Sequence, residues 1–273
     1  MIEILKAILF GIVEGITEWL PISSTGHMIL LNEFVTLDVS AEFWEMFLVV
    51  VQLGAILAVV LLFWNKIFPF DLKGKPFIKK DIFTLWFKII VACLPAAIVG
   101  ILFDDLFNAL FYNYTCVAIA LIVFGILFII IENRNAKENK APKITDVSQL
   151  TYKAAVIIGI WQLIAAIFPG TSRSGATIIG ALLLGVSRTV AAEFTFFLAI
   201  PVMFGASLLK LLKFGLAFSA AEWTILAVGM VVAFIVSVIV IRFLMGYIRK
   251  HDFKVFGWYR IVLGILVLLY FMF

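Results

Sequence analysis

Long runs of apolar residues, separated by short polar segments, dominate the chain. Six runs are long enough to cross the hydrocarbon core of a membrane, which takes about 20 residues. These predicted spans are 42–64, 82–103, 114–132, 189–213, 222–246 and 253–272. We therefore expect an all-α integral membrane protein.

Four further apolar runs are shorter or interrupted by polar residues, and they occur in two pairs. The paired runs are 3–20 with 26–35, and 152–168 with 175–186. A proline, Pro21 or Pro169, marks the turn within each pair. We predict two re-entrant helix pairs that enter the membrane, turn and leave by the same face. Polar loops at that depth are tolerated only where protein buries them or where they line a wet cavity.

Basic residues distinguish the two sides of the membrane. They cluster in the segments after the first, third and fifth spans: Lys66, Lys73, Lys75, Lys79, Lys80, Arg134, Lys137, Lys140, Lys143, Lys153, Arg249, Lys250 and Lys254. The segments 33–41, 104–113 and 214–222 carry no lysine or arginine, and Asp104 and Asp105 lie in the second of them. Because basic loops are cytoplasmic, both termini and the first re-entrant pair are expected on the outer side.

The two halves of the chain share a register. Pro21 aligns with Pro169 at a shift of 148 positions, which places Ser23 opposite Thr171 and Ser24 opposite Ser172. The same shift aligns Gly11 with Gly159, and a shift three positions larger aligns Gly54 with Gly205. This ordered set of matches indicates an internal repeat.

Each half contains one re-entrant pair followed by three spans, and an odd number of spans inverts the second half relative to the membrane. We predict an inverted-topology repeat, with a first repeat at 1–132, a cytoplasmic linker at 133–151 and a second repeat at 152–273. Repeats of this kind place their site near the middle of the membrane, where broken helices meet.

Two carboxylates lie on one face of the first re-entrant helix. Glu14 and Glu18 are one turn apart, and Gly11 and Gly15 share their face. Adjacent acids in a membrane repel unless a cation separates them. Carboxylates together with substrate phosphate oxygens are usual ligands of Mg²⁺. We expect Glu14 and Glu18 to bind a divalent cation, Mg²⁺ in preference and Ca²⁺ as the alternative; pairing with Arg173 or hydroxyls is the competing explanation.

Hydroxyl side chains mark the start of the second helix in each pair. They are Ser23, Ser24 and Thr25 in the first loop, and Ser172, Ser174 and Thr177 in and after the second. Some must cap their helices. The two helix starts point toward the middle of the membrane, and exposed helix N-termini bind anions. Arg173 in the second loop would grip phosphate oxygens in a fork, unless it serves only as an ion pair for Glu14 or Glu18.

His27 lies three residues after Ser24, so a hydroxyl–imidazole contact is within reach. In that case Ser24 is the nucleophile and His27 the general base and then acid, with Glu18 as the third catalytic residue. His27 could instead attack directly or activate water, and the sequence does not separate these mechanisms.

Composition supports the membrane class, since 64% of residues are hydrophobic and only 14% are charged. The net charge of +4 gives no reason to expect a nucleic-acid partner. The two cysteines, Cys93 and Cys116, have no partner motif and are expected to be free thiols.

The motifs Glu14-x-x-x-Glu18, Pro21-x-Ser-Ser-Thr-Gly-His27 and Pro169-Gly-x-Ser-Arg-Ser-x-x-Thr177 resemble those of the undecaprenyl-diphosphate phosphatase family of the bacitracin-resistance type. The resemblance runs through nearly the whole chain. It implies hydrolysis of undecaprenyl diphosphate to the monophosphate, which recycles a lipid carrier for cell-wall synthesis. It also implies a bacterial plasma membrane, a divalent cation and a site that opens to the outer face.

The resemblance assigns roles by position. Glu14 and Glu18 would handle the metal, Ser24 and His27 would form a catalytic dyad, and the second loop would hold the diphosphate through Ser172, Arg173, Ser174 and Thr177. A transporter or flippase for a phosphorylated lipid is the alternative, because inverted repeats with re-entrant hairpins are typical of carriers. The expected partners are a polyprenyl diphosphate and membrane lipid, and the oligomeric state is open, with a homodimer as one candidate.

Overall fold

The computed structural model describes residues 1–71, 77–111, 113–138, 141–215 and 218–272. Within these ranges the secondary structure is helical apart from two isolated β-bridges. The helices are α1 (Ile2–Thr17), α2 (Ser24–Phe34), α3 (Ala41–Val50), α4 (Gln52–Leu62), α5 (Trp64–Ile67), α6 (Lys80–Phe111), α7 (Tyr114–Glu138), η1 (Val147–Gln149), α8 (Tyr152–Ile167), α9 (Arg173–Leu183), α10 (Arg188–Phe214), α11 (Ala220–Tyr247) and α12 (Lys254–Met272).

All six predicted spans are confirmed as helices long and apolar enough to cross a membrane. They are Ala41–Leu62, Lys80–Phe103, Tyr114–Glu138, Arg188–Phe214, Ala220–Tyr247 and Lys254–Phe271. The chain is therefore an all-helical, multi-pass membrane protein. Both cysteines are free thiols, as expected from the sequence.

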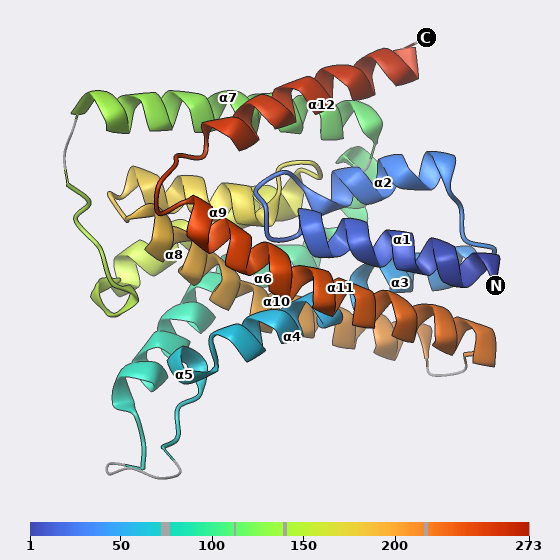
Figure 1. The fold of residues 1–273 in the computed structure, drawn as a ribbon, viewed down its shortest axis with the longest axis horizontal. Coiled ribbons are helices and arrows are strands. Elements are labelled where there is room, and N and C mark those ends of the chain that lie inside the picture. Colours follow the sequence, from blue (N-terminus) through green and yellow to red (C-terminus); the bar gives the residue numbers. More distant parts are fainter. Residues whose placement is uncertain (72–76, 112, 139–140, 216–217, 273) are drawn as a thin grey trace.

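The shorter helices form two hairpins that approach each other from opposite ends of the molecule. Helices α1 and α2 start and finish at the end where the N-terminus lies, whereas α8 and α9 belong to the opposite end (Figure 1). The C-terminus lies at the same end as the N-terminus, opposite the connection from α7 to α8 (Figure 1). This arrangement matches the expected re-entrant pairs, while the inverted-repeat relation and its division at 132 and 152 stay predictions.

The first spanning segment is broken, although the sequence predicted one continuous run at 42–64. The break falls at Val51, where the amide of Gly54 donates to the Val51 carbonyl 3.1 Å away in a tightened turn. Gly54 is also where α4 crosses α11, because a Cβ there would lie only 2.1 Å from the carbonyl oxygen of Met230. The tightened turn therefore falls where α4 packs most closely against α11.

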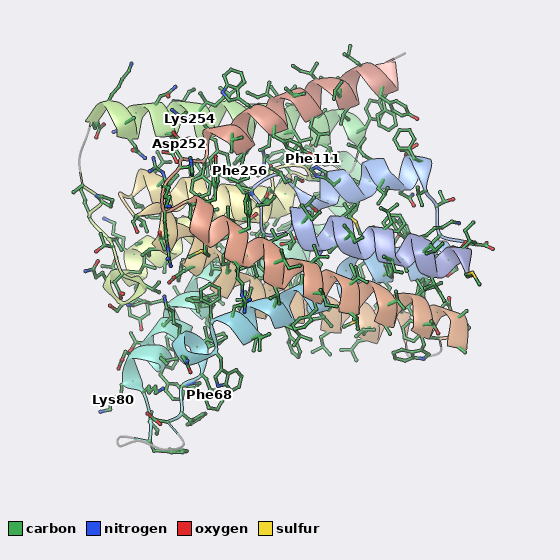
Figure 2. The ribbon with its side chains drawn as sticks, in the orientation of Figure 1. Phe68, Lys80, Phe111, Asp252, Lys254 and Phe256 are labelled. Carbon is green, nitrogen blue, oxygen red and sulfur yellow. The ribbon has the colours of Figure 1, made fainter. Side chains whose placement is uncertain are left out.

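Two connections are more helical than the sequence indicated. Helix α6 continues to Phe111, through much of the segment 104–113, and α7 continues to Glu138, past the predicted end at 132. Lys73, Lys75 and Lys140, together with the side chains of Asp104 and Asp105, lie outside the described residues. Asp252 and Lys254 form a 3.0 Å ion pair where α11 turns into α12 (Figure 2).

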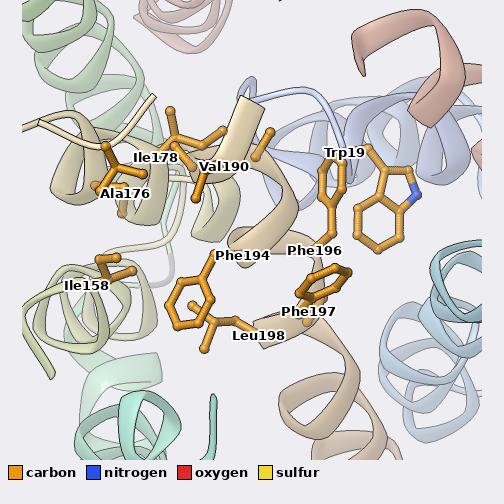
Figure 3. Close-up of a cluster of buried hydrophobic side chains, with 14 of the residues drawn as sticks. Trp19, Ile158, Ala176, Ile178, Val190, Phe194, Phe196, Phe197 and Leu198 are labelled. Atoms are coloured by element: carbon orange, nitrogen blue, oxygen red, sulfur yellow. The ribbon is translucent and has the colours of Figure 1, made fainter. Parts of the chain in front are cut away.

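The loop after α1 is anchored in the core by a tryptophan. Trp19 is fully buried and packs edge-on against Phe196 of α10, with ring centroids 5.2 Å apart. Figure 3 shows Trp19 beside Phe196 and Phe197, in a cluster that also includes Ile178 of α9. The same apolar cluster therefore holds the first loop and the second hairpin in place.

Candidate active site

The two hairpin loops meet inside the protein. The guanidinium of Arg173 in the second hairpin lies 2.8 Å from a carboxylate oxygen of Glu18 in the first. The hydroxyl of Ser174 also donates to the carbonyl of Glu18, at 3.3 Å. The prediction that an acid from the first half of the chain and an arginine from the second half lie in contact is thus confirmed.

Each loop ends in a strained serine that caps the next helix. Ser23 has a φ of 75° and accepts from the amide of Gly26, and Ser172 has a φ of 69° and accepts from the amide of Gly175. A positive φ is costly for a residue with a Cβ and persists only where its surroundings hold it. Such serines place the residue that follows them at the very start of a helix.

These caps correct the register predicted from the sequence. Ser23 corresponds to Ser172 rather than to Thr171, because both cap a helix in the same strained conformation. Ser24 and Arg173 then occupy matching positions as the first residues of α2 and α9. The second loop holds one more residue between its proline and its cap, which the ungapped alignment missed.

A chain of hydrogen bonds links Ser24 to Arg173 through Glu18. The Ser24 hydroxyl donates to Oε2 of Glu18 at 2.6 Å, and Oε1 of Glu18 accepts from Nη2 of Arg173 at 2.8 Å. Nη1 of Arg173 donates to the carbonyl of Thr195 at 2.9 Å. Glu18 is 6% exposed, so this ion pair is screened little by solvent. The arrangement orients a serine hydroxyl toward a carboxylate that an arginine fixes in place.

A cavity of about 150 Å³ opens beside this chain of contacts. It is lined by Glu18, Ser23, Ser24, Thr25, Gln52, Ala165, Pro169, Gly170, Ser172, Arg173, Val202, Met203 and Ala206. Gln52 is the first residue of α4, and sequence reasoning did not assign it to the site. The sequence signal that points to it is a polar residue inside an otherwise apolar span, since such residues tend to be functional.

Two ionisable side chains keep buried atoms without partners, and of these Arg173 lines the cavity whereas Glu14 is outside its described lining. Oε1 of Glu14 and Nε of Arg173 have no hydrogen-bond partner among the described residues. Glu14 is only 1% exposed. A buried polar atom without a partner is energetically expensive, so each of these atoms suits a ligand, ion or water that would pair with it. The carboxylate suits a cation and the guanidinium N–H suits an oxygen anion.

His27 is not where the sequence placed it. Its Nδ1 lies 2.7 Å from the carbonyl oxygen of Ser23, and its Nε2 lies 2.7 Å from the hydroxyl of Tyr259 on α12. The expected contact between Ser24 and His27 is therefore wrong, because the Ser24 hydroxyl bonds to Glu18 and both imidazole nitrogens bond elsewhere. On a helix start, the histidine ring reaches back to the carbonyl four residues earlier.

Two of the predicted diphosphate ligands, Ser174 and Thr177, form hydrogen bonds to other protein groups and are not in the described lining of the cavity. Ser174 is buried and reaches the carbonyls of Glu18 and Leu20, at 3.3 and 3.4 Å. The hydroxyl of Thr177 lies 2.8 Å from that of Thr195 and also donates to the carbonyl of Arg173. These side chains tie the loops together, whereas Ser172, Arg173, Ser23, Ser24 and Thr25 line the cavity.

Arg260 of α12 holds both loops and was not predicted. It is fully buried, and its guanidinium donates to the carbonyls of Pro21 (3.0 Å), Gly170 (3.0 Å) and Thr171 (2.7 Å). It also reaches the Leu121 carbonyl on α7, at 3.4 Å. Sequence reasoning could not single it out, since an arginine within a span often extends its charge to the membrane surface.

The family model described as "Bacitracin resistance protein BacA" matches residues 7–266. The chain belongs to the BacA family. Among similar proteins, the undecaprenyl-diphosphatase of Desulfitobacterium hafniense is 69% identical over 271 residues, covering 99% of this chain and 97% of the relative. Undecaprenyl-diphosphatase 1 of Clostridium acetobutylicum is also 69% identical, covering 99% and 98% of the two chains. The undecaprenyl-diphosphatase of Enterococcus faecalis is 65% identical over 270 residues, covering 98% and 97%.

Proposed function

We propose that this protein hydrolyses undecaprenyl diphosphate to undecaprenyl phosphate and inorganic phosphate. The proposal is supported by BacA-family membership and by full-length relatives that are named undecaprenyl-diphosphatases. The observation that carries it is the hydrogen-bonded chain of Ser24, Glu18 and Arg173 at a cavity within a membrane fold. The product is a lipid carrier that cell-wall synthesis can use again.

The residues present can perform this reaction in two steps. The Ser24 hydroxyl attacks the terminal phosphorus while Glu18, 2.6 Å away, accepts its proton. The bond between that phosphorus and the bridging oxygen breaks, and the lipid monophosphate leaves with the bridging oxygen. Water then cleaves the phosphoserine, which releases inorganic phosphate and restores the Ser24 hydroxyl.

Arg173 would hold the diphosphate through the guanidinium edge that has no protein partner. Its Nη1 and Nη2 are committed to Thr195 and Glu18, whereas Nε is buried and unpaired among the described groups. Charge-assisted bonds from a guanidinium to phosphate oxygens are strong and directional. The clamp would also stabilise the charge that develops on the transferred phosphoryl group.

The site also suits a divalent cation held by Glu14 and Glu18, with Mg²⁺ as the proposed ion and Ca²⁺ as the alternative. Glu14 carries a buried carboxylate oxygen without a partner, as a cation ligand would. The described residues contain no group of three or more His, Cys, Asp or Glu side chains that could hold a metal. The remaining ligands would be phosphate oxygens and water, and the ion would neutralise phosphate charge.

For the membrane arrangement we propose the bacterial plasma membrane, with both termini and the opening of the site on the outer face. The support is the clustering of lysine and arginine at the end opposite the termini, where α7 joins α8 (Figure 1). A homodimer stays a prediction that light scattering in detergent can check. The relatives' names favour hydrolysis over the transporter alternative.

Phosphate release by purified protein, with undecaprenyl diphosphate in detergent, tests the function. We expect turnover in the wild type, loss of turnover with a chelator, and loss in Ser24→Ala and Arg173→Ala with the fold retained. Ser237→Ala is the matched control, since Ser237 is a buried serine on α11 that bonds to the Gly15 carbonyl outside the cavity lining. Absence of phosphate release from the wild type, or full activity of Ser24→Ala, contradicts the proposal.

A further inference from the structure

The tautomer of His27 follows from its two hydrogen bonds. A carbonyl oxygen only accepts, so the 2.7 Å contact with the Ser23 carbonyl requires the proton on Nδ1. Nε2 of the neutral ring then accepts from the hydroxyl of Tyr259, also at 2.7 Å. The two ring planes are nearly parallel, with 5° between them and ring centroids 5.7 Å apart. Both nitrogens of His27 are therefore occupied by protein groups.

The proton of Ser24 already has another acceptor. Its hydroxyl donates to Glu18 at 2.6 Å, and Ser24 and Glu18 line the cavity. His27 is outside the described lining of that cavity. A histidine in this position and tautomer does not need to take part in proton transfer for Ser24 to be activated.

The imidazole instead holds the strained residue before Ser24. The Ser23 carbonyl accepts from Nδ1 of His27 and from the backbone amide of His27, at 2.7 and 3.3 Å. Ser23 adopts a φ of 75°, a conformation that is strained for a residue with a Cβ and persists only where its surroundings hold it. Without the imidazole, this carbonyl keeps only the longer hydrogen bond from the backbone amide, and the turn that orients the Ser24 hydroxyl is less constrained.

The last helix supports both strained turns through adjacent residues. Tyr259 orients His27 and thereby supports the turn at Ser23. Arg260 binds the carbonyls of Gly170 and Thr171, directly before the strained Ser172. The two loops are thus held by one short stretch of α12.

We propose that His27 is a positioning residue, which with Tyr259 fixes the turn that presents the Ser24 hydroxyl, and that Glu18 accepts the proton of Ser24. This proposal rests on the phosphatase function stated above. It differs from a Ser–His dyad in a way that can be measured, because positioning needs a hydrogen-bond donor near Nδ1, whereas base catalysis needs a group that can be protonated.

The test replaces His27 by asparagine and by alanine and measures phosphate release from undecaprenyl diphosphate. The amide nitrogen of asparagine can reach the Ser23 carbonyl as Nδ1 does, but the amide cannot act as a base. We expect His27→Asn to keep kcat within about tenfold of the wild type, which corresponds to loss of one hydrogen bond. His27→Ala should lose about 100-fold in kcat through misplacement of Ser24. KM should stay unchanged in both, because the Arg173 clamp is untouched.

Tyr259→Phe is an independent test of the same proposal, because this substitution removes one hydroxyl and preserves the aromatic ring. We expect kcat to fall by about three- to tenfold with KM unchanged, whereas Tyr270→Phe, on the same helix and half exposed, should match the wild type. Thermal unfolding in detergent shows whether each variant is folded.

An active wild type with His27→Asn as inactive as His27→Ala would overturn the proposal and restore His27 as a base. A Tyr259→Phe variant with wild-type kcat would overturn the part assigned to Tyr259. If the wild type itself releases no phosphate, it is the proposed function that fails. If His27→Asn does not fold, the kcat of Tyr259→Phe decides whether the positioning role stands.

Discussion

Arg260→Met removes the guanidinium that holds the two hairpin loops, and its effect can be worked from the contacts. Three loop carbonyls, those of Pro21, Gly170 and Thr171, would lose donors at 3.0, 3.0 and 2.7 Å. At about 1–3 kcal/mol for each buried group left unpaired, the folded state loses about 3–9 kcal/mol. Methionine avoids the cost of burying a charge, but removal of only one partner of a buried polar cluster is still destabilising.

The assay is thermal unfolding of purified protein in one detergent, with phosphate release measured on the same samples. At about 2–4 °C for each kcal/mol, the Tm of Arg260→Met should fall by at least about 6 °C. We also expect kcat to fall below that of the wild type at temperatures where the variant is folded, because Glu18 and Arg173 depend on the placement of both loops. The Tm and kcat of Arg260→Lys should lie between those of the wild type and Arg260→Met, since an ammonium group has three donors but lacks the planar fork of a guanidinium.

The matched control is Arg242→Met, which changes an exposed arginine on α11 and should alter stability by no more than about 0.5 kcal/mol. A Tm for Arg260→Met within 2 °C of the control, together with wild-type turnover, would refute the reasoning. It would mean that water or a rearranged loop satisfies the three carbonyls.

Three further predictions concern packing, the metal and the clamp. Gly54→Ala would place a carbon 2.1 Å from the Met230 carbonyl oxygen and should lower the Tm. Its control is Gly205→Ala, whose Cβ meets no described atom within 4 Å and which should leave the Tm unchanged. Equal Tm values for the two variants would contradict this packing. Glu14→Gln should raise the Mg²⁺ concentration for half-maximal phosphate release by at least about tenfold, and an unchanged titration would remove Glu14 from the metal site. Arg173→Lys keeps the charge and removes the unpaired Nε–H assigned to the diphosphate, so KM for the lipid should rise more than kcat falls. Unchanged steady-state kinetics would contradict the proposed clamp.

Much of the architecture could be predicted from the sequence, because membrane spans are recognised by length and hydropathy. The hairpins could be predicted as well, since Pro21 and Pro169 mark the turns between apolar runs that are too short to cross the membrane. The meeting of Glu18 and Arg173 followed from those two features. The break at Val51 was not predicted, because it depends on the crossing of α4 with α11, and the sequence shows only one polar residue, Gln52, at that point of the run.

The details of the site depended on tertiary contacts that spacing does not reveal. The three-residue spacing of Ser24 and His27 suggested a dyad. The Ser24 hydroxyl instead donates to Glu18, directly after α1, and Tyr259 of α12 bonds to His27. Tyr259 and Arg260 are distant in sequence from every motif. Their role becomes visible only when α12 is packed against α7 and the loops.

The position of Tyr259 and Arg260 near the end of the chain has a consequence for how the protein is made. During synthesis the two hairpins emerge first, but the groups that fasten their tips arrive only with α12. A nascent chain that has not yet inserted this helix holds loop carbonyls without donors at membrane depth. Catalytic competence is therefore gained only once α12 has inserted, and a protein cut short before α12 should be inactive even though every motif residue is present.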